Sequence, residues 1–244
     1  MKKQILKLLE QRFGYEIIKA KTKPNPDIDI DNDPHFLKHY QVCSPYTMTS
    51  KARMFALYQS IQYIQNAKIE GAVVECGVWR GGSSMMSALS LLPDTHREMY
   101  LYDTFEGMSE PTQADVNMVG DQAFDTWQGR DKCEADLNDV QTNMKLTQYP
   151  FDKIHFVVGK VEDTIPRTLP TKIALLRLDT DWYESTYHEL TYLFPLLAKG
   201  GVLIIDDYGH WEGARKAVDQ YLQENKIQIL LNRIDYTGRI AIKS

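Results

Sequence analysis

Aliphatic runs alternate with amphipathic stretches along the chain from residue 71 onward. The aliphatic runs predict strands at 72–76, 99–103, 154–158, 173–179, 202–206, 228–234 and 238–242. Apolar residues at helical spacing predict helices at 83–92, 184–198 and 212–224. Such alternation is typical of a mostly parallel sheet with helices on both faces, an α/β fold. The short turn at 235–238 predicts that the last two strands form an antiparallel hairpin.

The first 70 residues have a different pattern. Apolar residues at helical spacing between Ile5 and Phe13 predict an amphipathic helix, and the proline- and aspartate-rich stretch 23–34 predicts an extended linker. A second helix is expected after the Thr49-Ser50 cap. We expect residues 1–70 to be a helical extension and linker within the same domain as the catalytic part, 71–244, and the extra helices to support a homo-oligomer. The long polar connection at about 105–150 is expected to be functional or to carry its own helix.

The composition bears on whether the protein binds nucleic acid or a membrane. The chain has 244 residues, a net charge of −5 and three cysteines without metal-binding spacing. This balance favours neither nucleic acid nor a membrane surface as a partner. No apolar stretch approaches the roughly 20 residues that span a bilayer. We therefore expect a cytoplasmic protein with reduced thiols.

A glycine-rich turn follows the first predicted strand, at Glu75-Cys-Gly-Val-Trp-Arg-Gly-Gly-Ser-Ser84. Glycines let the backbone approach a ligand, and the start of the next helix offers free N–H groups to an anion. The spacing departs from the pyrophosphate-binding pattern and suits a ligand with a carboxylate, such as the amino-acid end of S-adenosylmethionine. Asp103, at the end of the second strand, is placed either to bind ribose hydroxyls or to cap a turn, and the pattern does not choose between them.

Four aspartates follow two of the predicted strands: Asp179 and Asp181 after one, Asp206 and Asp207 after the other. If these strands are neighbours, their ends lie about 4.8 Å apart, close enough for carboxylates from both to share a cation. Ligation by oxygen alone favours magnesium, calcium or manganese over zinc. Any one of these residues alone is more often a helix cap or a turn former, but four together favour a metal site.

The chain resembles the macrocin O-methyltransferase family in motifs at Tyr46-Thr-Met-Thr49, Val74-Glu-Cys-Gly-Val-Trp-Arg-Gly-Gly-Ser83, Tyr102-Asp-Thr-Phe-Glu-Gly-Met108, Leu176-Arg-Leu-Asp-Thr-Asp-Trp-Tyr-Glu-Ser-Thr186 and Gly200-Gly-Val-Leu-Ile-Ile-Asp-Asp-Tyr208. The resemblance implies a Rossmann-like methyltransferase fold and metal-dependent methylation of a sugar hydroxyl, with S-adenosylmethionine as methyl donor and magnesium as metal. It implies Asp179, Asp206 and Asp207 as metal ligands and Asp181 as general base. It also implies that the motif beginning at Tyr102 starts a mobile lid, at about 105–150, which closes over cofactor and acceptor. We expect the cofactor site to contain Met48, Glu75, Gly77, Ser83, Asp103, Thr104, Gly159, Val161 and Asp179.

Other functions fit the sequence less well. A catechol or phenolic O-methyltransferase would use much the same sheet and metal, but its lysine after the first metal aspartate is missing, since Thr180, Asp181 and Trp182 occupy that stretch. A nicotinamide-dependent oxidoreductase would need the diphosphate-binding glycine pattern. A non-catalytic cofactor-binding protein would not need all four aspartates. His210, His188 and His35 are alternative bases, each more often a surface or hydrogen-bonded histidine.

Overall fold

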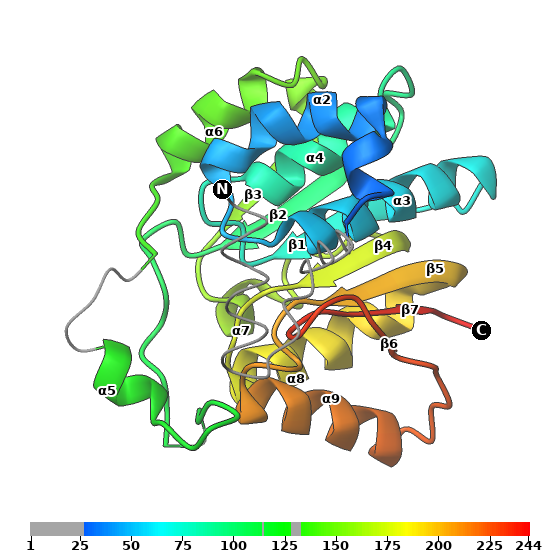
Figure 1. Cartoon of the computed structure of the whole chain (residues 1–244). Helices are drawn as coiled ribbons and strands as arrows, with labels where there is room; N and C mark the ends of the chain where they lie inside the picture. The colour runs from blue at the N-terminus through cyan, green and yellow to red at the C-terminus, as the bar shows by residue number, and fades with distance from the viewer. Residues whose placement is uncertain (1–26, 114, 128–132) are drawn as a thin grey trace, which may run out of the picture.

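A seven-stranded sheet forms the centre of the computed structural model, which describes residues 27–113, 115–127 and 133–244 (Figure 1). The strand order is β3-β2-β1-β4-β5-β7-β6. The strands are β1 Ala72–Cys76, β2 Met99–Asp103, β3 Ile154–Val158, β4 Ile173–Leu178, β5 Leu197–Ile205, β6 Asn232–Arg233 and β7 Arg239–Ile242. β1 to β5 pair in parallel, whereas β7 is antiparallel to both β5 and β6. The predicted mostly parallel sheet with a terminal antiparallel hairpin is confirmed.

Helices cover both faces of the sheet (Figure 1). One face carries α2 Pro34–Cys43, α3 Lys51–Asn66, α4 Gly82–Leu91 and α6 Leu137–Lys145; the other carries α7 Val161–Thr164, α8 Tyr183–Leu193 and α9 Glu212–Glu224. Successive strand residues point to opposite faces, so Val73 joins the first hydrophobic cluster and Val74 the second. The short α5, Ala123–Trp127, lies away from the sheet in Figure 1.

The strand order places a ligand crevice at one edge of the sheet. From β1 the chain continues to β2 and β3 on one side, and β4 and β5 lie on the other. In such sheets a crevice opens at the carboxyl ends of the strands where the order reverses, here between β1 and β4. The glycine-rich turn after β1 and the aspartates after β4 therefore meet at this point.

Two elements near the C-terminus differ from the prediction. The helix expected at 184–198 ends at Leu193, is followed by a 3₁₀ turn at Phe194–Leu196, and gives way to β5 at Leu197. Pro195 lies in that turn, and its ring and missing N–H prevent an α-helix from continuing. The strand expected at 228–234 is reduced to Asn232–Arg233. Its alternating apolar residues pack against the core cluster under α8 and α9 as a loop, which produces a strand-like pattern without a strand.

The N-terminal part also differs from the prediction. The helix expected between Ile5 and Phe13, and with it the proposed subunit contact, lies outside the described residues. Within the expected linker, Ile30–Asn32 form a 3₁₀ turn rather than extended chain, and α2 was not predicted. Asp33 caps α2 by accepting hydrogen bonds from two backbone N–H groups, and Pro34 occupies the first helical turn, where it is tolerated.

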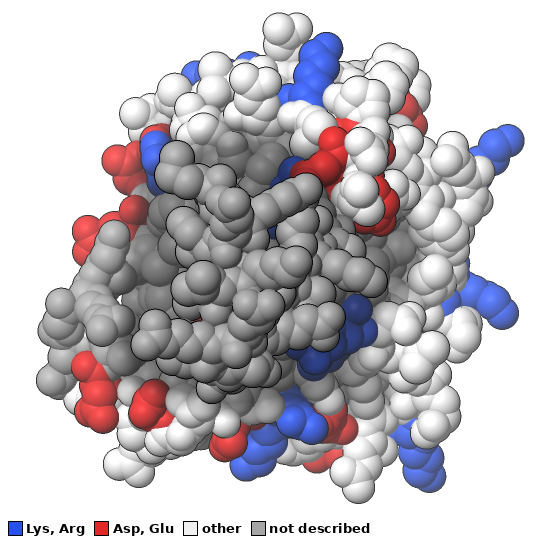
Figure 2. Space-filling view, viewed as in Figure 1, with Lys and Arg blue, Asp and Glu red and all other residues white. Residues whose placement is uncertain are grey.

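The surface and the helices bear on the class of partner. Acidic and basic side chains are both distributed around the edge of the face shown in Figure 2, and the described residues form no continuous basic surface on it. Among helices of the described residues, none combines the length and the apolar character that crossing a bilayer requires.

Candidate active site

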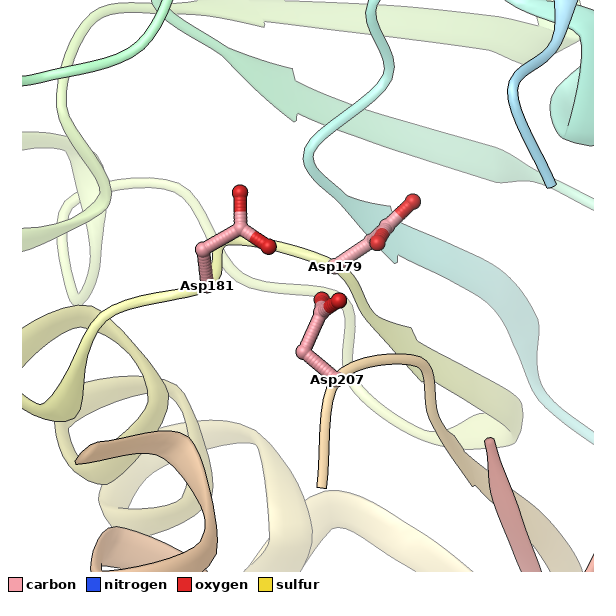
Figure 3. Close-up of side chains that lie close together, drawn as sticks. All are labelled: Asp179, Asp181 and Asp207. Carbon is pink, nitrogen blue, oxygen red and sulfur yellow. The ribbon is translucent and has the colours of Figure 1, made fainter. Parts of the chain in front are cut away.

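Three carboxylates converge at the ends of β4 and β5. These strands are parallel neighbours with Leu178 opposite Ile205, so their following residues lie level with one another. One carboxylate oxygen each from Asp179, Asp181 and Asp207 lies within 4.8 Å of the others, and Figure 3 shows the three side chains around a common space. Asp181 has a left-handed backbone with a φ of 66°, which turns its side chain back toward the cluster.

Asp206 lies apart from Asp179 and Asp207, the other two predicted metal ligands. Its carboxylate is buried and accepts from both arginines next to it: Arg177 Nη2 at 2.8 Å, and Arg53 Nη1 in a short ion pair. Adjacent strand residues point to opposite faces, and Asp206 points to the face on which Arg177 lies. The structure therefore groups Asp181, rather than Asp206, with Asp179 and Asp207. Which three carboxylates bind metal stays a prediction.

Arg177 balances the charge beneath the cluster. Its guanidinium is 2% exposed and forms ion pairs with Glu75 (2.5 Å), Asp179 (2.8 Å) and Asp206 (2.8 Å). Burial alone lowers the pKa of Arg177, but the charges of Asp179, Asp206 and Glu75 outweigh it and raise this pKa well above its ordinary value. Arg177 therefore stays charged and compensates three carboxylates: Glu75 in β1, Asp179 just after β4 and Asp206 just after β5.

Asp206 is buried and the three clustered carboxylates are half-buried, and burial shifts pKa values at both places. Burial, together with the charge of Asp179, raises the pKa of Asp181 to about 7. Burial raises the pKa of Asp206 to about 6 even though Arg177 lowers it, and the pKa of Asp207 lies well above its usual value because of burial and the charge of Asp181. Oδ2 of Asp207 is buried without a hydrogen-bond partner. A hard divalent cation would satisfy this oxygen-only set.

A cavity of about 480 Å³ joins the cluster to the glycine-rich turn. Eight of the nine predicted cofactor residues line it: Met48, Gly77, Ser83, Asp103, Thr104, Gly159, Val161 and Asp179. Glu75 does not line the cavity. Its buried carboxylate lies beneath, where it accepts short hydrogen bonds from Ser83 and Ser84 and pairs with Arg177. Glu75 therefore supports the turn from below.

Asp103 lies at the cavity and also fixes two turns. Its Oδ2 accepts from the backbone N–H groups of Val78 (2.6 Å) and Trp79 (3.0 Å), and its Oδ1 accepts from that of Phe105 (2.8 Å). The turn-capping interpretation is therefore present in the structure. Asp103 also lines the cavity, so ribose binding by its carboxylate stays a prediction.

Gly77 has no room for a side chain. Its φ is +81°, and a Cβ there would lie 2.0 Å from the carbonyl oxygen of Asp179. The ends of β1 and β4 can therefore approach this closely only with glycine at position 77.

Replacing Gly77 with alanine is expected to abolish cofactor binding and to destabilise the fold, because the methyl group would push the Asp179 backbone away. Gly120 offers a matched control: its φ is +93°, but a Cβ there meets nothing within 4 Å. Both substitutions carry the backbone strain of about 1–2 kcal/mol, and only Gly77→Ala carries the clash. Calorimetry with S-adenosylmethionine and thermal unfolding measure both effects. Equal losses in the two variants would show that the close approach is unimportant.

Several residues of the site were not predicted from the sequence. Arg53, Trp182, Trp211 and Tyr236 line the same cavity, and Trp182 packs edge-to-face against Trp211 at 5.2 Å between ring centroids. The two tryptophans come shortly after the two aspartate pairs, a signal that was available in the sequence. Arg53 comes from α3, and nothing in its local sequence places it beside Asp206.

The three histidines named above as alternative bases differ in their surroundings. His210 lines the cavity, and its Nδ1 makes a short hydrogen bond with the hydroxyl of Tyr236. His188 contacts the carbonyl oxygen of Ile165 through Nε2 at 2.9 Å, so it is a hydrogen-bonded structural histidine. His35 is exposed on α2, on the lining of a different cavity. Of these three histidines, only His210 lines the cavity that contains the carboxylate cluster.

The sheet order, the glycine-rich turn at β1 and the acidic cluster beside it define an S-adenosylmethionine-dependent O-methyltransferase, a class confirmed by the relatives. Within that class, the family described as Macrocin-O-methyltransferase (TylF) matches residues 33–242. The chain belongs to this family.

Known proteins align with this sequence over most of its length. A sequence from Streptomyces olivaceus, named 8-demethyl-8-(2,3-dimethoxy-alpha-L-rhamnosyl)-tetracenomycin-C 4'-O-methyltransferase, is 34% identical over 214 residues, 87% of this chain and 81% of the relative. Demethyldecarbamoylnovobiocin O-methyltransferase from Streptomyces niveus is 29% identical over 195 residues, 79% and 74% of the two chains. The solved O-methyltransferase NovP superposes with a TM-score of 0.74 at 27% identity, covering 82% of each chain.

Proposed function

We propose that this enzyme transfers the methyl group of S-adenosylmethionine to a hydroxyl of a sugar on a glycosylated small molecule, in a reaction that requires a divalent cation. The observation that carries the proposal is the position of Asp181, which lies on the same cavity as the predicted cofactor residues and beside two further carboxylates. The sugar acceptor is inferred from the relatives, one of which is named for a rhamnosyl-bearing substrate.

The donor side of the cavity would bind the cofactor through backbone and small side chains. Gly77 lets the chain approach a ligand, and Ser83 lies in the first turn of α4, whose free N–H groups favour a carboxylate. Gly159, with a φ of +129°, and Val161 form the rim after β3. These residues would hold the donor with its methyl group toward the aspartates.

The acidic cluster fits a divalent cation, magnesium first and manganese or calcium as alternatives. Asp179 and Asp207 belong both to the ligand set implied by the family and to the cluster in the structure. The third ligand would be Asp206, once Arg53 no longer pairs with it, or Asp181. A cation bound there would lower the pKa of the acceptor hydroxyl and orient it.

Asp181 is proposed to take the proton from the acceptor hydroxyl. The acceptor oxygen forms its bond to the methyl carbon as the sulfur–methyl bond of S-adenosylmethionine breaks, and the electron pair of that bond stays on the sulfur of the leaving S-adenosylhomocysteine. The hydroxyl proton passes to a carboxylate oxygen of Asp181. The indole N–H of Trp211 lowers the pKa of Asp181, against the larger effect of burial, and so favours the charged form that a base needs. Trp182 and Trp211 offer apolar ring faces to the acceptor side of the cavity.

Calorimetry with S-adenosylmethionine, followed by a methyl-transfer screen over glycosides and catechols with and without chelator, tests the proposal. We expect cofactor binding, transfer to glycosides and loss of transfer with chelator. Absence of cofactor binding would reject the proposal as a whole. Transfer to catechols alone would select a phenolic acceptor, and transfer unaffected by chelator would reject only the cation requirement.

Magnesium is expected to raise the melting temperature of the protein, and by more at pH 8 than at pH 5.5. Protons and the cation compete for the same oxygens, and burial raises the pKa values of Asp181 and Asp206 to about 7 and about 6. Acid therefore fills the site with protons, whereas at pH 8 the carboxylates are free to bind metal. Thermal unfolding with magnesium or with chelator measures the difference. Asp207→Asn should remove most of it; an equal magnesium effect in that variant would place the cation elsewhere.

A further inference from the structure

The helix that follows the proposed base is capped from a distant part of the chain. α8 begins at Tyr183, two positions after Asp181, and its N-cap residue Trp182 provides no side-chain cap. The cap comes from Asp115, 68 positions earlier, whose Oδ1 accepts from the backbone N–H of Tyr183 at 3.1 Å. Asp115 is 1% exposed, so this is a buried carboxylate at a helix N-terminus, where the helix dipole stabilises negative charge.

The same carboxylate closes its own turn. Oδ2 of Asp115 accepts from both the backbone N–H (2.7 Å) and the hydroxyl (2.9 Å) of Thr112. Gly213, in α9, leaves the space that Asp115 fills, because a Cβ at position 213 would lie 2.7 Å from Oδ1. Asp115 thus joins the segment before α5 to the start of α8. Its carboxylate fits there because α9 has glycine at position 213.

The rest of this segment lies along both loops that carry the acidic cluster. On the β4–α8 loop, Trp182 Nε1 donates to the carbonyl oxygen of Ser109 at 3.1 Å. On the β5–α9 loop, the carbonyl oxygen of Val116 accepts from Glu212 N (2.8 Å), and Met118 N donates to the carbonyl oxygen of His210 (3.0 Å). Within residues 109–118, of which 114 is not described, Ser109, Asp115, Val116 and Met118 therefore contact the loops of Asp181 and of Asp207 or the helix that follows.

The backbone at Asp181 needs such support. Its φ of 66° belongs to the left-handed region, which costs a non-glycine residue free energy and persists only where the surroundings hold it. β4 fixes the chain on one side of Asp181. On the other side the fixed point is the first turn of α8, which Asp115 caps.

We propose that Asp115 is a positioning residue, which anchors the segment 109–118 to the start of α8 and thereby holds Asp181 in place for proton removal. This role rests on the proposed function, since it takes Asp181 as the base. Asp115 contacts neither the acidic cluster nor the predicted cofactor residues; it acts through Tyr183 and the Trp182 loop.

Asp115→Ala is the test, with Asp33→Ala as its matched control. Asp33 caps α2 through the N–H groups of His35 (3.0 Å) and Phe36 (2.9 Å), so both variants lose one helix cap. Asp115→Ala is expected to lower kcat about 10- to 100-fold, the size of effect that a displacement of about 1 Å produces, while the Kd for S-adenosylmethionine stays within about twofold. Asp33→Ala is expected to lose similar stability and keep kcat.

Asp115→Asn separates the cap from the turn. Its amide oxygen can still accept from Tyr183 N–H, but its amide nitrogen would face the two donors of Thr112. An intermediate kcat is therefore expected. Equal losses of kcat in Asp115→Ala and Asp33→Ala would overturn the positioning role and leave a structural cap.

Amide hydrogen exchange provides a readout that does not depend on activity. Exchange at residues 181–186 should be faster in Asp115→Ala than in the wild type, and unchanged in Asp33→Ala. Unchanged exchange in both variants would overturn the anchor. A wild-type protein without methyl transfer, but with faster exchange in Asp115→Ala, would instead reject the proposed function and keep the anchor.

Discussion

Asp181→Asn is expected to lower kcat by about 10²- to 10⁴-fold, the contribution that a positioned general base makes. Asparagine has nearly the same size, but its amide cannot take a proton at neutral pH. Because the proposed role of Asp181 is toward the acceptor and not the cofactor, the Kd for S-adenosylmethionine should change little. Steady-state methyl transfer together with calorimetry separates the two quantities.

The pH dependence gives a second check on the same residue. A base must be deprotonated, so kcat/KM of the wild type should rise with pH through the pKa of Asp181. Burial and the charge of Asp179 raise this pKa to about 7, and a bound cation would lower it, which places the rise at or below pH 7. The residual activity of Asp181→Asn should lack this rise. Near-normal turnover in the variant would remove Asp181 from the base role and make His210→Gln the next test.

The central part of the fold was predictable because its strands are short runs rich in apolar residues. β1, β2 and β3 begin and end where the pattern places them. β1 is buried throughout, and the partly buried β2 and β3 are still rich in the aromatic and aliphatic residues that strands favour. The adjacency of β4 and β5, and hence the meeting of their aspartates, also follows from the order of such sheets. α2 was missed because Pro34 and the four aspartates before it suggest a linker, although Asp33-Pro34 is also a common helix start.

The arrangement inside the acidic cluster was less predictable. The direction of a side chain beyond the end of a strand depends on the turn that follows, and the left-handed backbone of Asp181 is not visible in its sequence. Asp206 is held by Arg53, a residue 153 positions away on a helix that packs over the sheet. Arg177 could have been noticed, because a charged residue within an otherwise aliphatic, fully buried strand needs partners of opposite charge.

Arg177→Met is expected to lower the free energy of unfolding by about 3–5 kcal/mol, the usual cost of leaving buried charges without their partner. Methionine fills similar space, but the buried carboxyl groups of Glu75 and Asp206 would lose the guanidinium that contacts both. Urea unfolding at pH 8 measures the loss. Arg80→Met is the matched control: Arg80 pairs through two nitrogens with Asp139, but both side chains are about one-third exposed. That variant should lose about 1 kcal/mol or less.

The loss in Arg177→Met should also depend on pH. The charge of Arg177 lowers the pKa of Asp206, so its removal raises that pKa further above the value in the unfolded chain. A carboxyl group whose pKa is raised in the folded state binds more protons there than in the unfolded state, and stability then falls as pH rises through this range. The deficit relative to wild type should therefore be smaller at pH 5 than at pH 8. A deficit at pH 8 no larger than that of Arg80→Met would mean that Arg53 alone compensates the buried carboxylates, and that Arg177 contributes orientation rather than charge balance.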